Sequence, residues 1–121
     1  MKIAFIFDTI LIEKDKDFYG MTLNYEFFTS RYLSMFDSIV VSTRVAPIAK
    51  ARGDVSGYKV VNGPSIDVKP IRSYHDIPDA IRNSKQIKSE LEEVISSSDK
   101  IIIRMPSVLG MFATEICKKL N

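Results

Sequence analysis

The sequence contains no window of about 18 consecutive apolar residues, although hydrophobic residues make up 45% of its 121 positions. The first property excludes a membrane span, and the second excludes a disordered chain. The apolar start lacks a small-residue cleavage site and is interrupted by Asp8, so we expect no signal peptide. A single cysteine, Cys117, cannot form an internal disulfide, which favours a reducing cytoplasm.

The sequence also has little excess of one charge over the other. Its 17 Lys and Arg nearly balance its 15 Asp and Glu, which gives a formal net charge of +2. So small and dispersed an excess does not predict a nucleic-acid surface. The sequence has no internal repeat, low-complexity tract or linker. We therefore expect one α/β domain over residues 1–121, long enough to bury a core without disulfides.

Short apolar or β-branched runs alternate along the chain with segments of helical periodicity. Strands are predicted over residues 2–7, ended by Asp8, over 38–42 and over 100–104, with weaker ones over 58–61 and 66–68. Helices are predicted over 22–36, with Thr22 as the N-cap, over 78–98, with Asp76 or Ile77 near the start, and over 109–120. This alternation predicts an open, mostly parallel, Rossmann-like α/β sheet with helices on both faces.

Common nucleotide and phosphate motifs are missing. The glycine nearest to the first strand is Gly20, twelve positions past Asp8, so there is no dinucleotide fingerprint, and a Walker A loop is absent. Asp8 starts a string like the loop of haloacid-dehalogenase-like phosphatases, but Ile10 stands where that loop has its second aspartate. Receiver domains need an acidic pair that is also lacking. His75 is the only histidine, so we predict no metal site, no cofactor and no catalytic set.

Ligands of open α/β sheets bind beyond the carboxyl ends of the strands, so the loops that begin at Asp8, Ser42 and Arg104 are the first candidates. Arg104 ends a buried strand and the next helix starts near Ser107, which offers fixed positive charge and free amide donors to a phosphate or a sugar hydroxyl. The alternative is that Pro106 and Ser107 only start the helix, and the residue types alone favour it.

Three other features have plain structural interpretations. Residues 13–17 form a mixed-charge run that is typical of a solvated mobile loop, with a lid as the alternative. Cys117 falls on an apolar helical face and is expected in the core. His75 precedes the long predicted helix, where a structural hydrogen bond or plain exposure is favoured, and its role stays open.

The order of elements resembles the N-terminal half of the GT-B-fold glycosyltransferases of the family 4 type. The resemblance is carried by residues 98–107 and by the helix that follows them, with its Lys-rich end. In residues 98–107 an Asp precedes a buried strand, and a polar loop follows that strand. The opening is similar as well, with an apolar strand, a loop that contains Tyr19 and Gly20, a helix, and a strand ending at Arg44. Many members have a glycine pair where this chain has Gly20 alone, and histidines at positions 104–106. The family's second domain, with its nucleotide-sugar pocket, lies outside these residues.

The resemblance implies the N-terminal, acceptor-side domain of a metal-independent glycosyltransferase. Such an enzyme moves sugar from a nucleotide-sugar donor to a glycan or lipid-linked acceptor in surface polysaccharide synthesis. The isolated chain is then expected to be inactive, with substrate contacts at Tyr19, Gly20, Arg44, Arg104 and Ser107. Arg104 and Ser107 are predicted to lie together at the carboxyl end of a central strand and to face a cleft shared with the Gly20 loop. The resemblance also implies peripheral membrane association of the full-length enzyme.

Two expectations concern other partners. If the family topology holds, the edge of the 100–104 strand is open, and we expect a homodimer through it. The competing expectation is a monomer in which residues 58–68 supply the flanking strand. The second hypothesis for function, from a different class, is a small noncatalytic α/β module that binds an anionic ligand or a protein partner.

Overall fold

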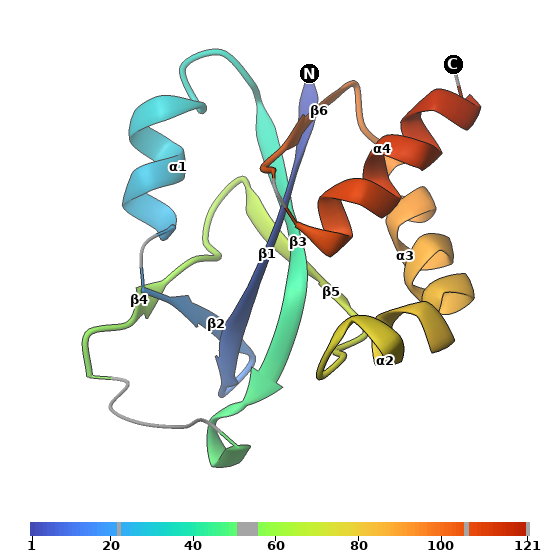
Figure 1. Cartoon of the computed structure of the whole chain (residues 1–121). Coiled ribbons are helices and arrows are strands. Elements are labelled where there is room, and N and C mark those ends of the chain that lie inside the picture. The colour runs from blue at the N-terminus through green and yellow to red at the C-terminus, as the bar shows by residue number, and fades with distance from the viewer. Residues whose placement is uncertain (22, 51–55, 106, 121) are drawn as a thin grey trace.

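The computed structural model describes residues 1–21, 23–50, 56–105 and 107–120. Within them the chain forms an open, mixed α/β sheet with helices on both faces (Figure 1), as the sequence predicts. The strands are β1 (Lys2–Lys14), β2 (Asp17–Gly20), β3 (Ser38–Pro47), β4 (Lys59–Val60), β5 (Ile66–Ile71) and β6 (Lys100–Ile103). The helices are α1 (Tyr25–Arg31), α2 (Ile77–Arg82), α3 (Ser84–Ser96) and α4 (Val108–Leu120), with a 3₁₀ turn at Ile48–Lys50.

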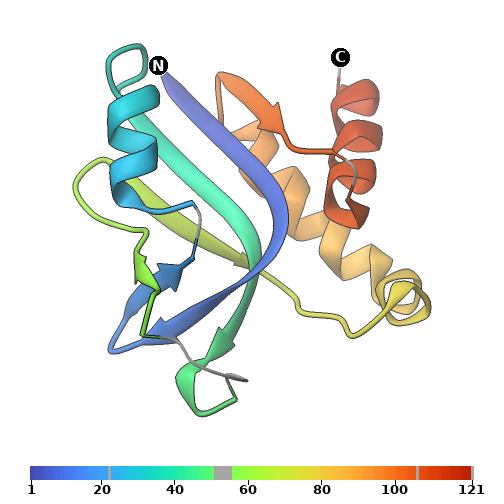
Figure 2. The same cartoon turned by 60° about the vertical axis from the view of Figure 1, so that its left-hand side comes forward.

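Parallel pairing joins β5 to β3, β3 to β1 and β1 to β6, so these strands lie in the order β5-β3-β1-β6. An antiparallel extension adds β2 to the far part of β1 and β4 to β2. β6 and β2 thus lie toward opposite ends of β1 (Figure 2). The expected alternation with helices holds for two of the connections, because α1 lies between β1 and β3, and α2 and α3 lie between β5 and β6. β3 and β5 are instead joined through the 3₁₀ turn and β4, with no α-helix among the described residues between them.

The first strand is longer than predicted. Asp8 does not end it, because β1 continues to Lys14 after an irregularity in its pairing with β3 between Ile6 and Ile10. Asp15 and Lys16, with φ of 53° and 70°, form the turn of the hairpin into β2. Positive φ at both central residues gives a turn whose twist matches the strands. Residues 13–17 are solvated as expected, but they form a hairpin and not an irregular loop, and the lid stays a prediction.

Two predicted helices are shorter in the structure. α1 begins after Asn24, whose side-chain oxygen accepts from the Phe27 N–H at 3.1 Å, and it ends at Arg31; Thr22 lies outside the described residues. The helix predicted over 78–98 is divided at Asn83 into α2 and α3, and Asp76 is the N-cap of α2 as expected. The Asn83 side chain donates to the Asp79 carbonyl at 2.9 Å, which ends the first piece.

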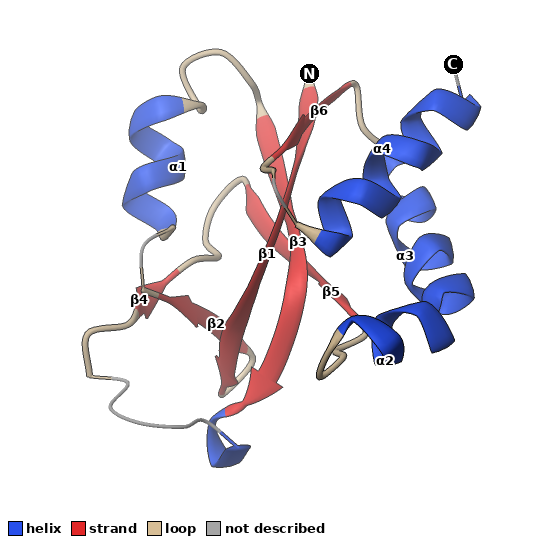
Figure 3. Ribbon diagram, viewed as in Figure 1, coloured by secondary structure: helices blue, strands red, loops and turns tan. Residues whose placement is uncertain are grey.

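The two faces of the sheet are covered differently (Figure 3). On one face a single helix, α1, packs an aromatic cluster in which the Phe5 and Phe28 ring centroids lie 5.1 Å apart. On the other face α2, α3 and α4 pack aliphatic side chains such as Ile87, Leu91 and Leu109 against Ile6. Cys117 is half-buried at the edge of this second cluster, and burial raises the pKa of its thiol.

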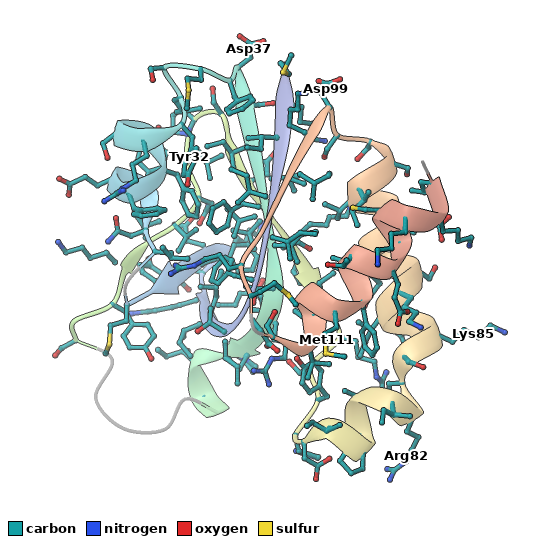
Figure 4. All side chains as sticks on the ribbon, turned by 45° about the horizontal axis from the view of Figure 1, so that its top comes forward. Tyr32, Asp37, Arg82, Lys85, Asp99 and Met111 are labelled. Atoms are coloured by element: carbon teal, nitrogen blue, oxygen red, sulfur yellow. The ribbon has the colours of Figure 1, made fainter. Side chains whose placement is uncertain are left out.

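The amino end of β1 is fastened from both sides. The N-terminal ammonium pairs with Asp37, and the Lys2 N–H donates to the Asp99 carboxylate at 2.7 Å. Figure 4 shows Asp37 and Asp99 together at this end, with Met111 of α4 toward the other. The carboxyl ends of the parallel strands, where open α/β sheets bind their ligands, lie at the opposite end of the sheet.

The outer edge of β6 pairs with no strand among the described residues. Residues 58–68 supply β4 and β5, which pair with β2 and β3, so the expectation that they flank β6 is wrong. The expected dimer through this edge stays a prediction. No helix in the described ranges is long and apolar enough to cross a membrane.

Candidate functional site at the fork of the sheet

The central strand β1 has one long partner strand along one edge and two short partner strands, separated by a gap, along the other. β3 follows β1 from Lys2 to Glu13 on one edge. On the opposite edge β6 pairs with β1 only from Ile3 to Ile6, and β2 only from Ile12 to Lys14. Residues 7–11 therefore have no strand partner on this edge within the part of the chain that the structure describes. This opening is called the fork below.

A pocket of about 380 Å³ lies in the fork. Its lining consists of residues 7–11 of β1, of Gly20, Met21 and Leu23 around the end of β2, of Tyr58, and of Arg104, Met105 and Ser107 in the β6–α4 connection. Such a volume is within the range of small-molecule sites. Segments far apart in sequence thus meet at one concave surface.

Position 20 requires glycine because the backbone of Leu23 lies very close to it. A Cβ atom at this position would lie 2.8 Å from the Leu23 carbonyl oxygen and 3.1 Å from a Leu11 methyl group. Real side chains essentially never come that near to backbone, so any larger residue displaces the pocket wall. Gly20 is accordingly a packing requirement of this wall.

The β6–α4 connection is held by its own hydrogen bonds. The Arg104 N–H donates to the Ile6 carbonyl at 2.9 Å, which continues the β1–β6 ladder by one residue. Ser107 accepts from the Gly110 N–H at 2.8 Å and donates to the Arg104 carbonyl at 3.0 Å, so its hydroxyl caps α4. The capping interpretation of Ser107 is confirmed, whereas Pro106 lies outside the described residues. The Arg104 side chain is exposed and has no ion-pair partner in the described ranges.

Three side chains from different segments form a closed cluster beside the pocket, called the brace below. The Arg44 Nε donates to one Asp8 oxygen at 2.8 Å and the Tyr74 hydroxyl donates to the other. A second guanidinium nitrogen donates to the Tyr74 carbonyl at 3.0 Å, and the guanidinium carbon lies 4.4 Å from the centroid of the Tyr74 ring. Burial raises the pKa of the Tyr74 phenol above its usual range, and the hydrogen bond to Asp8 acts in the same direction.

The structure brings together three of the five residues predicted to contact substrate. Gly20, Arg104 and Ser107 line the fork pocket, as expected from the sequence. The strand before Arg104 is an edge strand and not the expected central one, because β6 pairs with β1 alone among the described residues. Tyr19 lines a neighbouring pocket of about 300 Å³ that shares Tyr58 with the first. Arg44 belongs to the brace instead. A binding role for any of the five stays a prediction.

Sequence reasoning missed Tyr74 and the structural role of Asp8. Asp8 was visible as a charge at the end of an apolar run, but its partner Tyr74 lies 66 positions away and no local pattern points to it. His75 is exposed, and its backbone N–H donates to the Asp79 carboxylate at 3.0 Å. The described residues contain no cluster of three or more His, Cys, Asp or Glu suited to a metal ion.

Comparisons with known proteins give one informative match. No family model matches the chain, and no solved structure matches it significantly. The chain is similar over its whole length to Protein CapJ of Staphylococcus aureus, with 34% identity over 122 residues. It spans only 30% of the length of that relative, so the similarity concerns a part of CapJ.

Proposed function

We propose that this chain is the N-terminal, acceptor-side domain of a glycosyltransferase that transfers sugar from a nucleotide-sugar to a glycan or lipid-linked acceptor. The observation that carries the proposal is the position of the fork pocket. In the order β5-β3-β1-β6 the chain moves outward from β1 to β5 and then returns to the other edge of β1 with β6. Open α/β sheets bind ligands at such a reversal, outside the carboxyl ends of the strands.

The pocket offers binding groups rather than a reaction centre. Thr9, Tyr58 and Arg104 are among the polar residues of its lining. Asp8 already accepts from Arg44 and Tyr74, so its oxygens are engaged, and no histidine lines the pocket. A domain that binds and orients an acceptor, while another part of the enzyme holds the donor diphosphate, fits this set.

The two pockets suggest how a longer acceptor runs. Because Tyr58 lines both, a saccharide bound near Arg104 extends past Tyr58 toward Tyr19. Arg44 acts in this proposal through Asp8, by fixing the floor of the fork. The similarity to a segment of CapJ supports membership of a longer protein, in which the nucleotide-sugar is bound by other residues. Surface polysaccharide synthesis in the cytoplasm, with peripheral membrane association of the full-length enzyme, belongs to the same proposal.

A chimaera tests the proposal. This chain replaces the matched 122-residue segment of CapJ, and the gene is returned to a staphylococcal strain that lacks CapJ. We expect the deletion to reduce surface polysaccharide, the chimaera to restore it, and a chimaera with Gly20→Leu, which fills the pocket wall, to fail at equal protein level. Polysaccharide unaffected by loss of CapJ contradicts the proposal.

The isolated chain gives a second test. Because the described pocket holds no acid–base set, purified chain is expected neither to transfer sugar nor to release UDP or GDP from nucleotide-sugars. Steady release that is abolished by Arg104→Ala would show a complete active site in these residues and overturn the division into two halves.

A further inference from the structure

The charges of the ionisable side chains described in the fork pocket do not cancel. Asp8, Tyr58 and Arg104 are the ionisable residues of its lining. The Asp8 carboxylate is matched by Arg44, with side chains only 12% and 17% exposed, so this pair is neutral as a unit. Tyr74, the third member of the brace, is uncharged at neutral pH, since the ordinary pKa of a tyrosine is already about 10 and burial raises it further. Among the described residues of the lining, the charge left over is the positive charge of Arg104.

The brace is what leaves Arg104 unbalanced. If Asp8 were free, its carboxylate would face the same pocket as Arg104 and cancel its charge for an incoming ligand. Arg44 and Tyr74 take up both Asp8 oxygens, and Tyr74 itself belongs to the cluster packed under α2, α3 and α4. Because the Asp8–Arg44 pair is mostly buried, its two charges interact mainly with each other and only weakly with a ligand in the pocket.

We propose that the fork pocket selects an anionic saccharide, one that carries a carboxylate or a phosphate, and that Arg104 is the specificity-determining residue. This inference rests on the proposed acceptor function and narrows its substrate class. A planar guanidinium can donate two parallel hydrogen bonds to either anion, so the two groups share one recognition chemistry. Met21 and Met105 are exposed side chains of the same lining and carry no charge. Arg104 therefore dominates the charge that a ligand encounters.

The test is a binding titration of the isotope-labelled chain, followed by amide chemical shifts of residues 7–11 and Arg104. The probes are methyl glucuronide, glucosyl phosphate and the neutral methyl glucoside. We expect the anionic sugars to bind about fivefold more tightly than the neutral one, the size of one partly exposed ion pair. The tighter of the two anions identifies the acceptor's group as carboxylate or phosphate.

Matched variants separate charge from shape. Arg104→Gln is expected to abolish the preference for anions, and Arg104→Lys to keep most of it. Arg44→Gln frees the Asp8 charge and should also abolish the preference, whereas Asp8→Asn with Arg44→Gln should restore it, since the added charge is gone again. Amide spectra of each variant confirm that it is folded, and the double variant keeps the test decisive if Arg44→Gln alone does not fold.

The remaining outcomes overturn the inference in distinguishable ways. Equal binding of neutral and anionic sugars, unchanged in Arg104→Gln, removes the anionic selectivity and leaves the acceptor function standing. A preference that survives Arg104→Gln removes the role of Arg104. If no sugar shifts the amides of residues 7–11, the inference and the proposed acceptor function fail together.

Discussion

The two edges of β1 show a division between scaffold and site. Along one edge β3 pairs on both sides of a single irregularity, and residues 39–43 of β3 are buried, as Ile39 is with 2% exposure. Along the other edge β6 and β2 are short and leave the fork between them, where Thr9 and Ile10 are exposed. A sheet can give up pairing on one edge of its central strand because the other edge holds that strand in place, and the open stretch of backbone becomes a binding surface.

The largest expected effect tests whether the continuous edge carries the stability. Ile39→Ala and Ile102→Ala remove the same atoms from the two strands that flank Phe5 and face the same aromatic cluster. We expect a loss of about 3 kcal/mol for buried Ile39 and of about 1.5 kcal/mol for half-buried Ile102 in the free energy of unfolding. Urea unfolding measures both, and equal losses would contradict the division.

The brace joins the two regions, and Asp8→Asn breaks it. Arg44 would then lose its counter-ion in a site that is about five-sixths buried, so we expect a loss of about 2 kcal/mol, below the cost of fully buried pairs because some water reaches it. Asp67→Asn, at an exposed strand position, is the matched control and should change stability by less than about 0.5 kcal/mol. Similar values for both variants would show that the brace does not stabilise the fold.

The sequence predicted the strands wherever their burial is set by their own apolar residues. Residues 2–7, 38–42 and 100–103 are strands because such runs are buried on both faces of a parallel sheet. Asp8 was expected to end the first strand, since a charge is costly inside a sheet. It stays in the strand because Arg44 and Tyr74, both distant in sequence, neutralise it and bond it. Boundaries that depend on tertiary partners are not encoded locally.

As with the strands, the sequence predicted some parts of the candidate site and not others. The rule that ligands lie at strand carboxyl ends led to Arg104 and Ser107, and the family resemblance pointed to Gly20. The fork itself could not be foreseen, because it depends on β2 turning back beside β1 at an unrecognised Asp15–Lys16 hairpin turn. The break at Asn83 was hidden for a similar reason, since Ile77 and Ile81 continue the apolar pattern yet are exposed on α2.

Gly20 tests the forked edge at smaller scale. Gly20→Ala places a methyl group 2.8 Å from the Leu23 carbonyl, so the wall must shift, and we expect a loss of about 1 kcal/mol together with altered amide shifts around the pocket. Gly57→Ala is the control, because nothing lies within 4 Å of its added Cβ. If both variants were equally stable, the wall would be more yielding than its contacts indicate.

Alkaline pH probes the brace without substitution. The folded chain raises the pKa of Tyr74 and of Cys117, so it binds protons more firmly than the unfolded chain does. This contribution is complete below the ordinary pKa values, about 8.5 for Cys and about 10 for Tyr, and is lost as the pH rises through the folded values. Urea midpoints should therefore fall between about pH 8 and about pH 10.5. Tyr74→Phe should flatten the upper part of this fall, and an unchanged profile would exclude Tyr74 as its source.

The smallest expected effect is self-association through the outer edge of β6. The Arg104 N–H faces β1, so by strand alternation Ile101 and Ile103 direct their backbone groups outward and could pair with a second copy. The longest two-fold antiparallel register places Lys100 opposite Arg104 of the second copy, and like charges at facing positions oppose pairing. We therefore expect a weak dimer, seen by sedimentation only at high concentration, that Lys100→Glu strengthens by exchanging repulsion for attraction. A sharp monomer at every concentration for both chains, with strong amide protection along residues 101–103, would show that this edge is closed by other means.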